Sequence, residues 1–241
     1  MSNKVQVDDV LINPNLALTS WVAFKKVRKQ TMVMGDLVLL STEVPPAMSM
    51  LVGRGLKVSA LHNHILGESP RVMYMHFSGH GEAIRLADAI KAVLAQTGPP
   101  LGSPSATGQA STIDWSNVES ILRLTGQRKG NVIQFGVARA ETITVNKMKI
   151  PPFMGVATSI NMQSVGERVA TTGDFVLVAS EVNPVVKTLT DYGIAVTAIH
   201  NHMLAESPRL FFLHFWGVGQ PDRLARGLRA ALDETNLQKT K

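Results

Sequence analysis

The chain has 241 residues, of which 45% are hydrophobic and 17% are charged, so it is long enough to bury a substantial core. It contains no cysteine, which excludes disulfide frameworks, thiolate metal sites and cysteine nucleophiles. The net charge is +6, but Lys and Arg are scattered rather than gathered on one stripe, and no run of about eighteen apolar residues occurs. We therefore expect no nucleic-acid partner and no membrane span.

The N-terminus lacks the apolar core of a secretory signal. As the chain stands we expect a cytoplasmic protein, with an exported origin only if the N-terminus has been trimmed. The sequence does not determine the oligomeric state, and a homo-oligomer stays open.

The chain is internally repeated. Val5–Thr97 aligns without a gap onto Ile143–Thr235, always at an offset of 138 positions. A duplicated unit of this length predicts a pseudo-two-fold architecture. We place the first repeat unit at 1–98, a turn-rich linker at 99–111 and the second unit, with an extra helix-strand lead-in, at 112–241.

Each unit is predicted to be β-α-β-β-α. In the first unit we expect, in order, an extended segment at 18–26, a strand at 33–41, a short helix opened by Glu43 and two prolines and ended by Gly55, a strand at 57–66, a turn at 67–70, a strand at 71–78 and a helix at 82–96. The fold class is therefore α+β, with an antiparallel sheet covered by helices.

The second unit repeats this order. We expect a strand at 171–179, a helix opened by Glu181 and Pro184 and ended by Gly193, and a last helix from Pro221 to Glu234. The lead-in consists of a helix at 114–124 and a strand at 131–139. Neither has a counterpart before the first unit.

A His/Glu motif occurs once in each unit. It supplies His62, His64, Glu68 and His76 in the first unit and His200, His202, Glu206 and His214 in the second. Alternate residues of a strand share a face, so the first two histidines of each motif should point the same way, and the third should return on the next strand. Three imidazoles and a carboxylate form a ligand set for a divalent transition metal: zinc is preferred, with manganese, iron, nickel or copper as alternatives.

Other repeated polar residues have candidate roles. Glu68 and Glu206 are metal ligands or general bases. Arg71 and Arg209 bind an anionic substrate, or pair with a neighbouring carboxylate. Two further pairs have structural interpretations: Glu43 and Glu181 favour a helix N-terminus, and Asp36 and Asp174 follow a glycine and shape a turn. The seventh histidine, His80, corresponds to Val218 in the second unit.

The motif segments carry a resemblance to a known family. Gly35–Leu39, Ala60–His64, Gly67–Arg71 and Met75–His76, with their second-unit equivalents through Leu213–Trp216, resemble the LppY/LpqO-like family of bacterial proteins related to mycobacterial lipoproteins. The resemblance covers nearly the whole chain. It implies a duplicated-domain architecture, and because members of that family often look exported, the absence of a signal here is a departure from their pattern.

The leading interpretation is a divalent-metal-binding protein with one His/Glu site in each repeat, acting as a hydrolase or an oxidoreductase on a small-molecule substrate. Two alternatives stay open. The site binds a metal or a small anion without turnover, as in a carrier or sensor, or it is a metal-free cluster of catalytic, substrate-binding or hydrogen-bonded core histidines.

Overall fold

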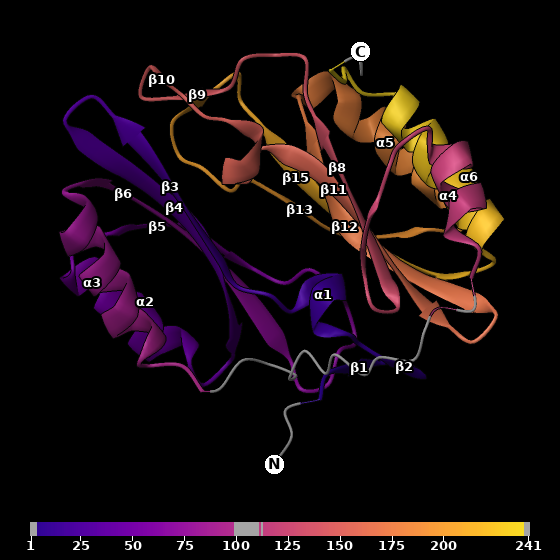
Figure 1. Cartoon of the computed structure of the whole chain (residues 1–241), viewed down its shortest axis with the longest axis horizontal. Helices are drawn as coiled ribbons and strands as arrows, with labels where there is room; N and C mark the ends of the chain where they lie inside the picture. Colours follow the sequence, from indigo (N-terminus) through magenta and orange to yellow (C-terminus); the bar gives the residue numbers. More distant parts are fainter. Residues whose placement is uncertain (1–3, 99–110, 112, 239–241) are drawn as a thin grey trace.

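The structure is a computed structural model that describes residues 4–98, 111 and 113–238. In this part of the chain two large antiparallel β-sheets lie side by side and carry helices on their outer faces (Figure 1), and two small sheets of two and three strands accompany them. The α+β class and the helix-covered antiparallel sheets are thereby confirmed. None of the described helices has the length and apolar character needed to span a bilayer.

The first sheet has four strands in the order β3-β4-β6-β5, and its outer face is covered by α2 and α3 (Figure 1). These elements are β3 (Trp21–Val27), β4 (Gln30–Leu40), α2 (Val44–Gly53), β5 (Lys57–His62), β6 (Val72–Gly81) and α3 (Ala83–Leu94). They are preceded by β1 (Gln6–Val7), β2 (Val10–Leu11) and α1 (Pro14–Ala17). Helix α1 lies between the two sheets (Figure 1).

The second sheet has six strands in the order β13-β15-β12-β11-β8-β7 under α4, α5 and α6. These elements are α4 (Trp115–Leu122), β7 (Gln127–Lys129), β8 (Val132–Ala138), β11 (Ala157–Val165), β12 (Arg168–Leu177), α5 (Ala179–Asp191), β13 (Ala195–His200), β15 (Phe211–Gly219) and α6 (Pro221–Asp233). Shorter elements are β9 (Thr144–Val145), β10 (Met148–Lys149), the 3-10 helix η1 (Pro152–Met154) and β14 (Glu206–Ser207). Strands β11, β12, β15 and β13 follow the same order as β3, β4, β6 and β5, and β8 and β7 extend this sheet at the β11 edge.

Alternation along the strands sorts apolar side chains into two layers, because successive residues point to opposite faces. On β4, Val33 and Leu37 pack beneath α2 and α3. Met34 points the other way and joins an apolar cluster with Val176 and Phe212 of the second sheet. Each large apolar side chain buried in this way stabilises the fold by roughly 1.5–3 kcal/mol.

A second apolar cluster also joins the two halves. It contains Val7, Leu16 and Tyr74 from the first half and Val132 and Ala170 from the second. Side-chain amides on the second sheet add to it by donating to carbonyl groups of α1. The inner faces of both sheets are therefore held together by contacts that are far apart in sequence.

The helix ends follow the predicted glycines. Gly55 and Gly193 come shortly after α2 and α5 and have φ angles of 79° and 76°, a region that glycine occupies without a Cβ clash. The predicted start of α5 was wrong, because the helix begins at Ala179 and Pro184 lies inside it. The earlier start is explained by Glu181, whose carboxylate Oε2 accepts from the backbone N–H of Val178 at 2.9 Å.

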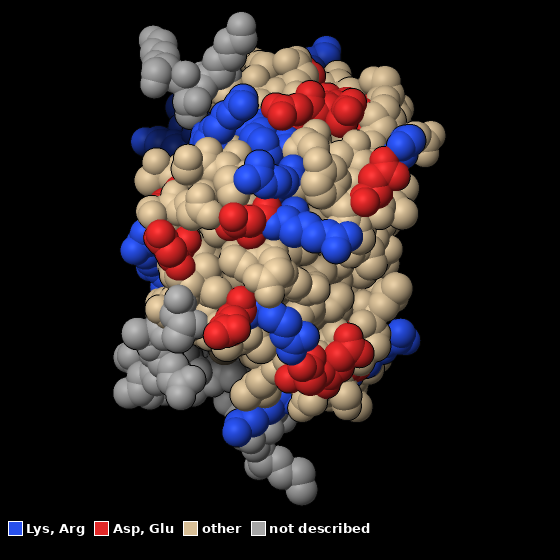
Figure 2. Space-filling model, turned by 90° about the vertical axis from the view of Figure 1, so that its right-hand side faces the viewer, with Lys and Arg blue, Asp and Glu red and all other residues tan. Residues whose placement is uncertain are grey.

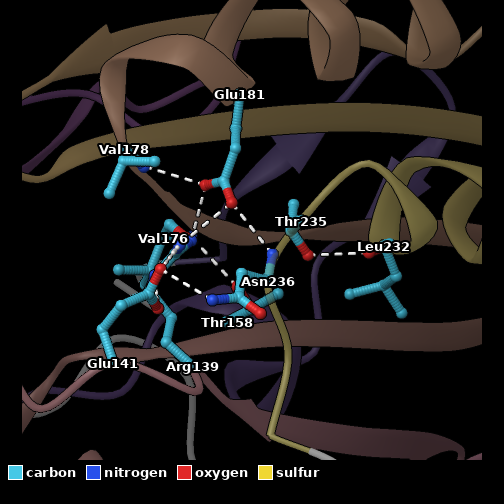
Figure 3. A network of polar contacts seen from close by, with 9 residues as sticks. All are labelled: Arg139, Glu141, Thr158, Val176, Val178, Glu181, Leu232, Thr235 and Asn236. Atoms are coloured by element: carbon cyan, nitrogen blue, oxygen red, sulfur yellow. Dashed lines mark hydrogen bonds and ion pairs between the residues drawn. The ribbon is translucent and has the colours of Figure 1, made fainter.

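Glu181 is also the centre of a buried polar network (Figure 3). Its Oε2 atom lies 2.6 Å from Nη1 of Arg139, whose side chain is only 1% exposed. The same guanidinium donates to Glu141 at 2.8 Å, and the backbone N–H of Asn236 donates to Glu181 at 2.9 Å. Glu181 thus ties the end of β8 to α5 and to the C-terminal segment.

The helical side of the second half carries mixed charges. Seen from the side of α4 and α6, blue basic and red acidic side chains interleave over the surface (Figure 2). Ion pairs along the helices contribute to this mixing, with Lys187 and Asp191 2.6 Å apart on α5 and Arg229 and Asp233 2.7 Å apart on α6. The Lys187–Asp191 pair is exposed, and such a pair contributes at most about 1 kcal/mol.

Candidate metal centre

The histidines of each motif sit where an edge strand ends and its neighbour returns. His62 is the last residue of β5, and His76 lies within β6. In the second half His200 is the last residue of β13, and His214 lies within β15. Their side chains point toward the opposite sheet, away from the covering helices, because β6 and β15 put their apolar alternates under those helices.

The prediction that the second histidine of each motif lies on the strand was wrong. Strand pairing stops at His62 opposite Tyr74, so His64 belongs to the loop that follows β5, and His202 belongs to the loop that follows β13. The Asn63 side chain, which follows His62 directly, donates to the Ile65 carbonyl at 3.2 Å and bends the chain out of the sheet.

The six motif histidines form a single cluster. We call it the histidine cluster, and it has three layers, each of which pairs a ring from one half with a ring from the other. The central pair is His62 and His200, with ring centroids 3.7 Å apart. In one flanking layer His64 stacks on His214, and Tyr74 also stacks on His64. In the other flanking layer His202 stacks on His76, and Phe212 also stacks on His202.

Spacing within the cluster is tight. His64 lies 3.8 Å from His214, and His76 lies 3.7 Å from His202, measured between ring centroids. His62 is 5.0 to 5.2 Å from His64, His76, His202 and His214, so the central pair lies between the flanking layers. The sequence predicted one site in each repeat, and the structure instead mixes the two sets of histidines.

The ring nitrogens are arranged for metal ligation. The Nε2 atoms of all six histidines are buried and have no hydrogen-bond partner among the described residues. On the other side of the ring, Nδ1 of His62 faces the Asn63 carbonyl at 3.2 Å, and Nδ1 of His214 faces the Gly173 carbonyl at 3.0 Å. A proton on Nδ1 satisfies these carbonyls and leaves the Nε2 lone pair free, the arrangement typical of metal-bound imidazoles.

Four histidines lie close enough to hold a metal ion: His62, His200, His202 and His214, whose ligand atoms all lie within 4.8 Å of one another. One of the four comes from the first half and three come from the second. Neither Glu68 nor Glu206 belongs to this set.

Two carboxylates that the sequence analysis assigned to turns lie beside the cluster. Asp36 sits in the middle of β4, with Oδ2 3.8 Å from Nε2 of His76. Asp174 sits in β12, with its carboxylate 3.9 Å from Nδ1 of His214 and 4.0 Å from Nδ1 of His202. The turn prediction was wrong for both, and a carboxylate in an otherwise apolar strand at the same place in each repeat was the signal that could have revealed them.

A glycine precedes each of these aspartates, Gly35 before Asp36 and Gly173 before Asp174. Close packing between strands, rather than a turn, explains why glycine is needed there. A Cβ at Gly173 would collide with the Ser159 carbonyl oxygen on the neighbouring strand. A Cβ at Gly35 would lie 2.7 Å from the Trp21 carbonyl oxygen. Glycine therefore lets the sheet close up next to each aspartate.

Burial sets the protonation of these groups. It raises the pKa of Asp36 to about 8. The pKa of Asp174 is raised well above its usual value, mainly by burial and to a smaller extent by the negative charge of Asp36. Burial, with the neighbouring His200, lowers the pKa of His62 to about 3, and burial lowers the pKa of the five other cluster histidines. The imidazoles are therefore neutral at pH 7, the form that binds metals.

The remaining predicted site residues shape the loops. Oε1 of Glu206 accepts from the backbone N–H of Leu210 at 3.2 Å, and the same carboxylate pairs with Arg209. Glu68 accepts from the backbone N–H of Val72 at 3.4 Å, while its Oε2 atom is buried without a described partner. Arg71 is exposed. The structure thus brings the histidines together but sets the arginines at the loop surface.

A cavity of about 600 Å³ opens onto the cluster. Its lining includes His64, His76, His202 and both aspartates, together with Trp21, Phe153, Asn15, Gln134, Asn161 and Lys129. The lead-in strands β7 and β8 form part of the wall. The volume lies in the range of small-molecule sites.

Comparisons with known proteins give a family and little else. A family model described as "Domain of Unknown Function (DUF1259)" matches residues 1–96 and 116–234. No curated protein matches the chain. The regulatory subunit of aspartate kinase from Thermus thermophilus aligns at 13% identity over 90% of this chain and 98% of that one, and EtuB from Clostridium kluyveri at 8% over 89% and 85%. Both have a TM-score of 0.24, which supports no inference about fold or function.

Proposed function

The chain belongs to the family described as Domain of Unknown Function (DUF1259), and we propose that this member binds a divalent transition metal through imidazoles contributed by both halves of the chain. The observation that carries the proposal is the set of six buried Nε2 atoms without a described hydrogen-bond partner. Buried polar atoms in folded proteins are nearly always satisfied, and leaving one bare costs about 1–3 kcal/mol. A structural network of core histidines would have provided partners for them.

The donor set favours zinc, with manganese, iron, nickel or copper as alternatives, because the chain has no cysteine thiolate and the clustered donors are imidazole nitrogens. His62, His200, His202 and His214 are the primary ligands of the proposed ion. Asp36, which is buried, and Asp174, which is partly buried, lie beside them and would ionise next to the ion, offsetting its charge.

The cavity favours catalysis over storage. A carrier site is closed by protein ligands, whereas a catalytic site keeps a position open to a substrate. His64, His76 and His202 all line the cavity, so a small molecule inside it reaches the cluster directly. An ion held there supplies Lewis-acid chemistry, in keeping with a hydrolase or an oxidoreductase.

The chain's own residues have positioning roles in this proposal. The Asn63 and Gly173 carbonyls orient the rings of His62 and His214. Tyr74 fixes His64 by ring stacking at 3.4 Å, and its hydroxyl donates to the Ala17 carbonyl at 3.0 Å. Glu68, with a free buried oxygen, is a candidate proton acceptor, whereas Glu206 is paired with Arg209.

The arrangement of the halves supports a duplication. Asp36 pairs with His76 across β4 and β6, and Asp174 pairs with His214 across β12 and β15. The stacking of His64 on His214 is mirrored by that of His202 on His76. We include in the proposal that the two units are related by a pseudo-two-fold axis through the central pair, and that the chain is a relative of the LppY/LpqO-like proteins.

Elemental analysis of the untagged protein tests this function. The wild-type chain should retain a transition metal at a stoichiometry of at least one per chain, and a His200→Ala/His202→Ala variant should lose it. His80→Ala is the matched control, because His80 is exposed on β6 and outside the cluster, and it should keep the full metal content. A wild-type protein that binds no metal after supplementation refutes the function.

A further inference from the structure

The histidine cluster offers more donors than one ion uses. The four-histidine set leaves His64 and His76 over, and their Nε2 atoms are as buried and as unpartnered as the other four. A tetrahedral ion takes four ligands. An ion at the four-histidine set alone would therefore leave two imidazoles unsatisfied inside the protein.

The two remaining histidines lie in different layers. His64 stacks on His214 on one side of the central pair, and His76 stacks on His202 on the other. Each flanking layer thus holds two imidazoles, one from each half. The central pair lies between them, with His200 4.8 Å from His202 and 5.0 Å from His214. One ring of the central pair can serve each layer.

The carboxylates extend the donor set. Asp36 lies 3.8 Å from His76, and Asp174 lies within 4.0 Å of both His202 and His214. Their Oδ1 atoms are buried and have no hydrogen-bond partner among the described residues. No described Lys or Arg forms an ion pair with either aspartate. Six imidazoles and two carboxylates give eight donors, enough for two four-coordinate ions.

Resting on the metal-binding function proposed above, we infer that the histidine cluster is a dinuclear centre. One divalent ion is held by His64, His214 and one ring of the central pair, and the second by His76, His202 and the other ring. Asp36 and Asp174 complete or bridge the two coordination shells. Paired ions facing one cavity clamp both oxygens of a displacement reaction, so the substrate class is a phosphate ester or another hydrolysable oxyacid derivative.

The number of bound ions and the magnetic exchange coupling between them test the inference. The metal-free full-length chain is titrated with Mn²⁺ and separately with Co²⁺, and bound metal is counted by elemental analysis after gel filtration. We expect two ions per chain and, with Mn²⁺, an electron paramagnetic resonance spectrum of an exchange-coupled pair. Saturation at one ion with an uncoupled spectrum overturns the dinuclear centre and leaves the proposed function standing. Saturation at zero refutes both.

A double variant tests the ligand assignment. His64→Ala/His76→Ala removes one ligand from each ion and should abolish the exchange coupling and leave fewer than two ions bound per chain, while His80→Ala should keep both ions and their coupling. Circular dichroism and gel filtration establish that the variants are folded. If the double variant misfolds, the wild-type count and spectrum still decide. A folded double variant that retains two coupled ions contradicts the assignment.

Discussion

His62 and His200 meet ring against ring, 3.7 Å apart between centroids, although each is the last residue of an edge strand in a different sheet. Neither half of the chain contains the cluster on its own. The contact exists because two apolar clusters dock the inner faces of the sheets, one through Met34 and Phe212 and the other through Leu16 and Val132. Metal binding and docking of the halves should therefore be coupled.

Removal of His62 alone tests the sharing of ligands between halves. His62→Ala leaves every second-half histidine in place, yet the affinity of the tightest-bound ion should fall by roughly 100-fold or more, since loss of even an outer partner costs 10–100-fold. Isothermal titration with Co²⁺ measures this, with His80→Ala as the control. An unchanged affinity would mean that the second half binds metal by itself.

Coupling to stability gives a second prediction. The proposed ligands from the two halves come together only when the halves are docked, so saturating metal should raise the free energy of unfolding, by about 2.7 kcal/mol at one hundred times the dissociation constant. Denaturant unfolding with and without a chelator measures the difference. The effect should vanish in His200→Ala/His202→Ala. An equal gain in that variant would place the ion elsewhere.

Asp36 gives a pH-dependent prediction for the metal-free protein. Burial raises its pKa to about 8, whereas the unfolded value is near 3.8. Its contribution to stability is therefore complete below about pH 4 and is lost as the pH rises toward 8. Asp36→Asn removes this loss, so the variant should gain stability over wild type, and the gain should grow from pH 5 to pH 8. Paired denaturant curves at several pH values measure the gain, and a constant difference would contradict the prediction.

Glu181 should matter for the fold rather than for metal. Glu181→Gln removes one of the two carboxylates that face the buried Arg139 guanidinium and leaves Glu141 in place, so the variant should lose roughly 1.5–3 kcal/mol, as for a hydrogen bond to a charged group. Glu43→Gln is the matched control, because Glu43 accepts from the backbone N–H groups of Leu40 and Gly98 and has no described arginine partner. Thermal unfolding should separate the two variants clearly, and equal melting temperatures would refute the role of the ion pair.

Gly173 tests the packing behind the cluster. A Cβ there meets the Ser159 carbonyl oxygen, and the Gly173 carbonyl also accepts from His214. Gly173→Ala should lower stability by about 1–3 kcal/mol and weaken metal binding. Gly136→Ala in the same sheet has open space around its Cβ and should be tolerated. Equal stability of the two variants would count against the close approach of β11 and β12.

The elements that local patterns encode could be predicted from the sequence. The amphipathic helices α3 and α6, the glycines that follow α2 and α5, and the lead-in pair α4 and β8 lie close to their predicted positions. The sequence also singled out the six motif histidines, which the structure brings into one cluster. Each of these signals depends on residues that are near one another in the chain.

What could not be predicted depends on contacts between distant residues. No local pattern states that His64 leaves the strand to stack on Tyr74 and His214, or that Asp36 and Asp174 face the same cluster. Both outcomes follow from how the two sheets dock. The assignment of the linker at 99–111 concerns residues that, apart from 111, lie outside the described part of the chain, and the predicted unit boundaries stay predictions.

The central claim is that a metal ion is held by imidazoles from both halves. Anomalous diffraction at the absorption edge of the bound metal, on crystals of the untagged chain, tests it most directly. The account predicts anomalous density within about 2.0–2.1 Å of Nε2 atoms from both halves, His62 together with His200, His202 or His214 among them. Density bound by histidines of one half only, or lying outside the cluster, would contradict it.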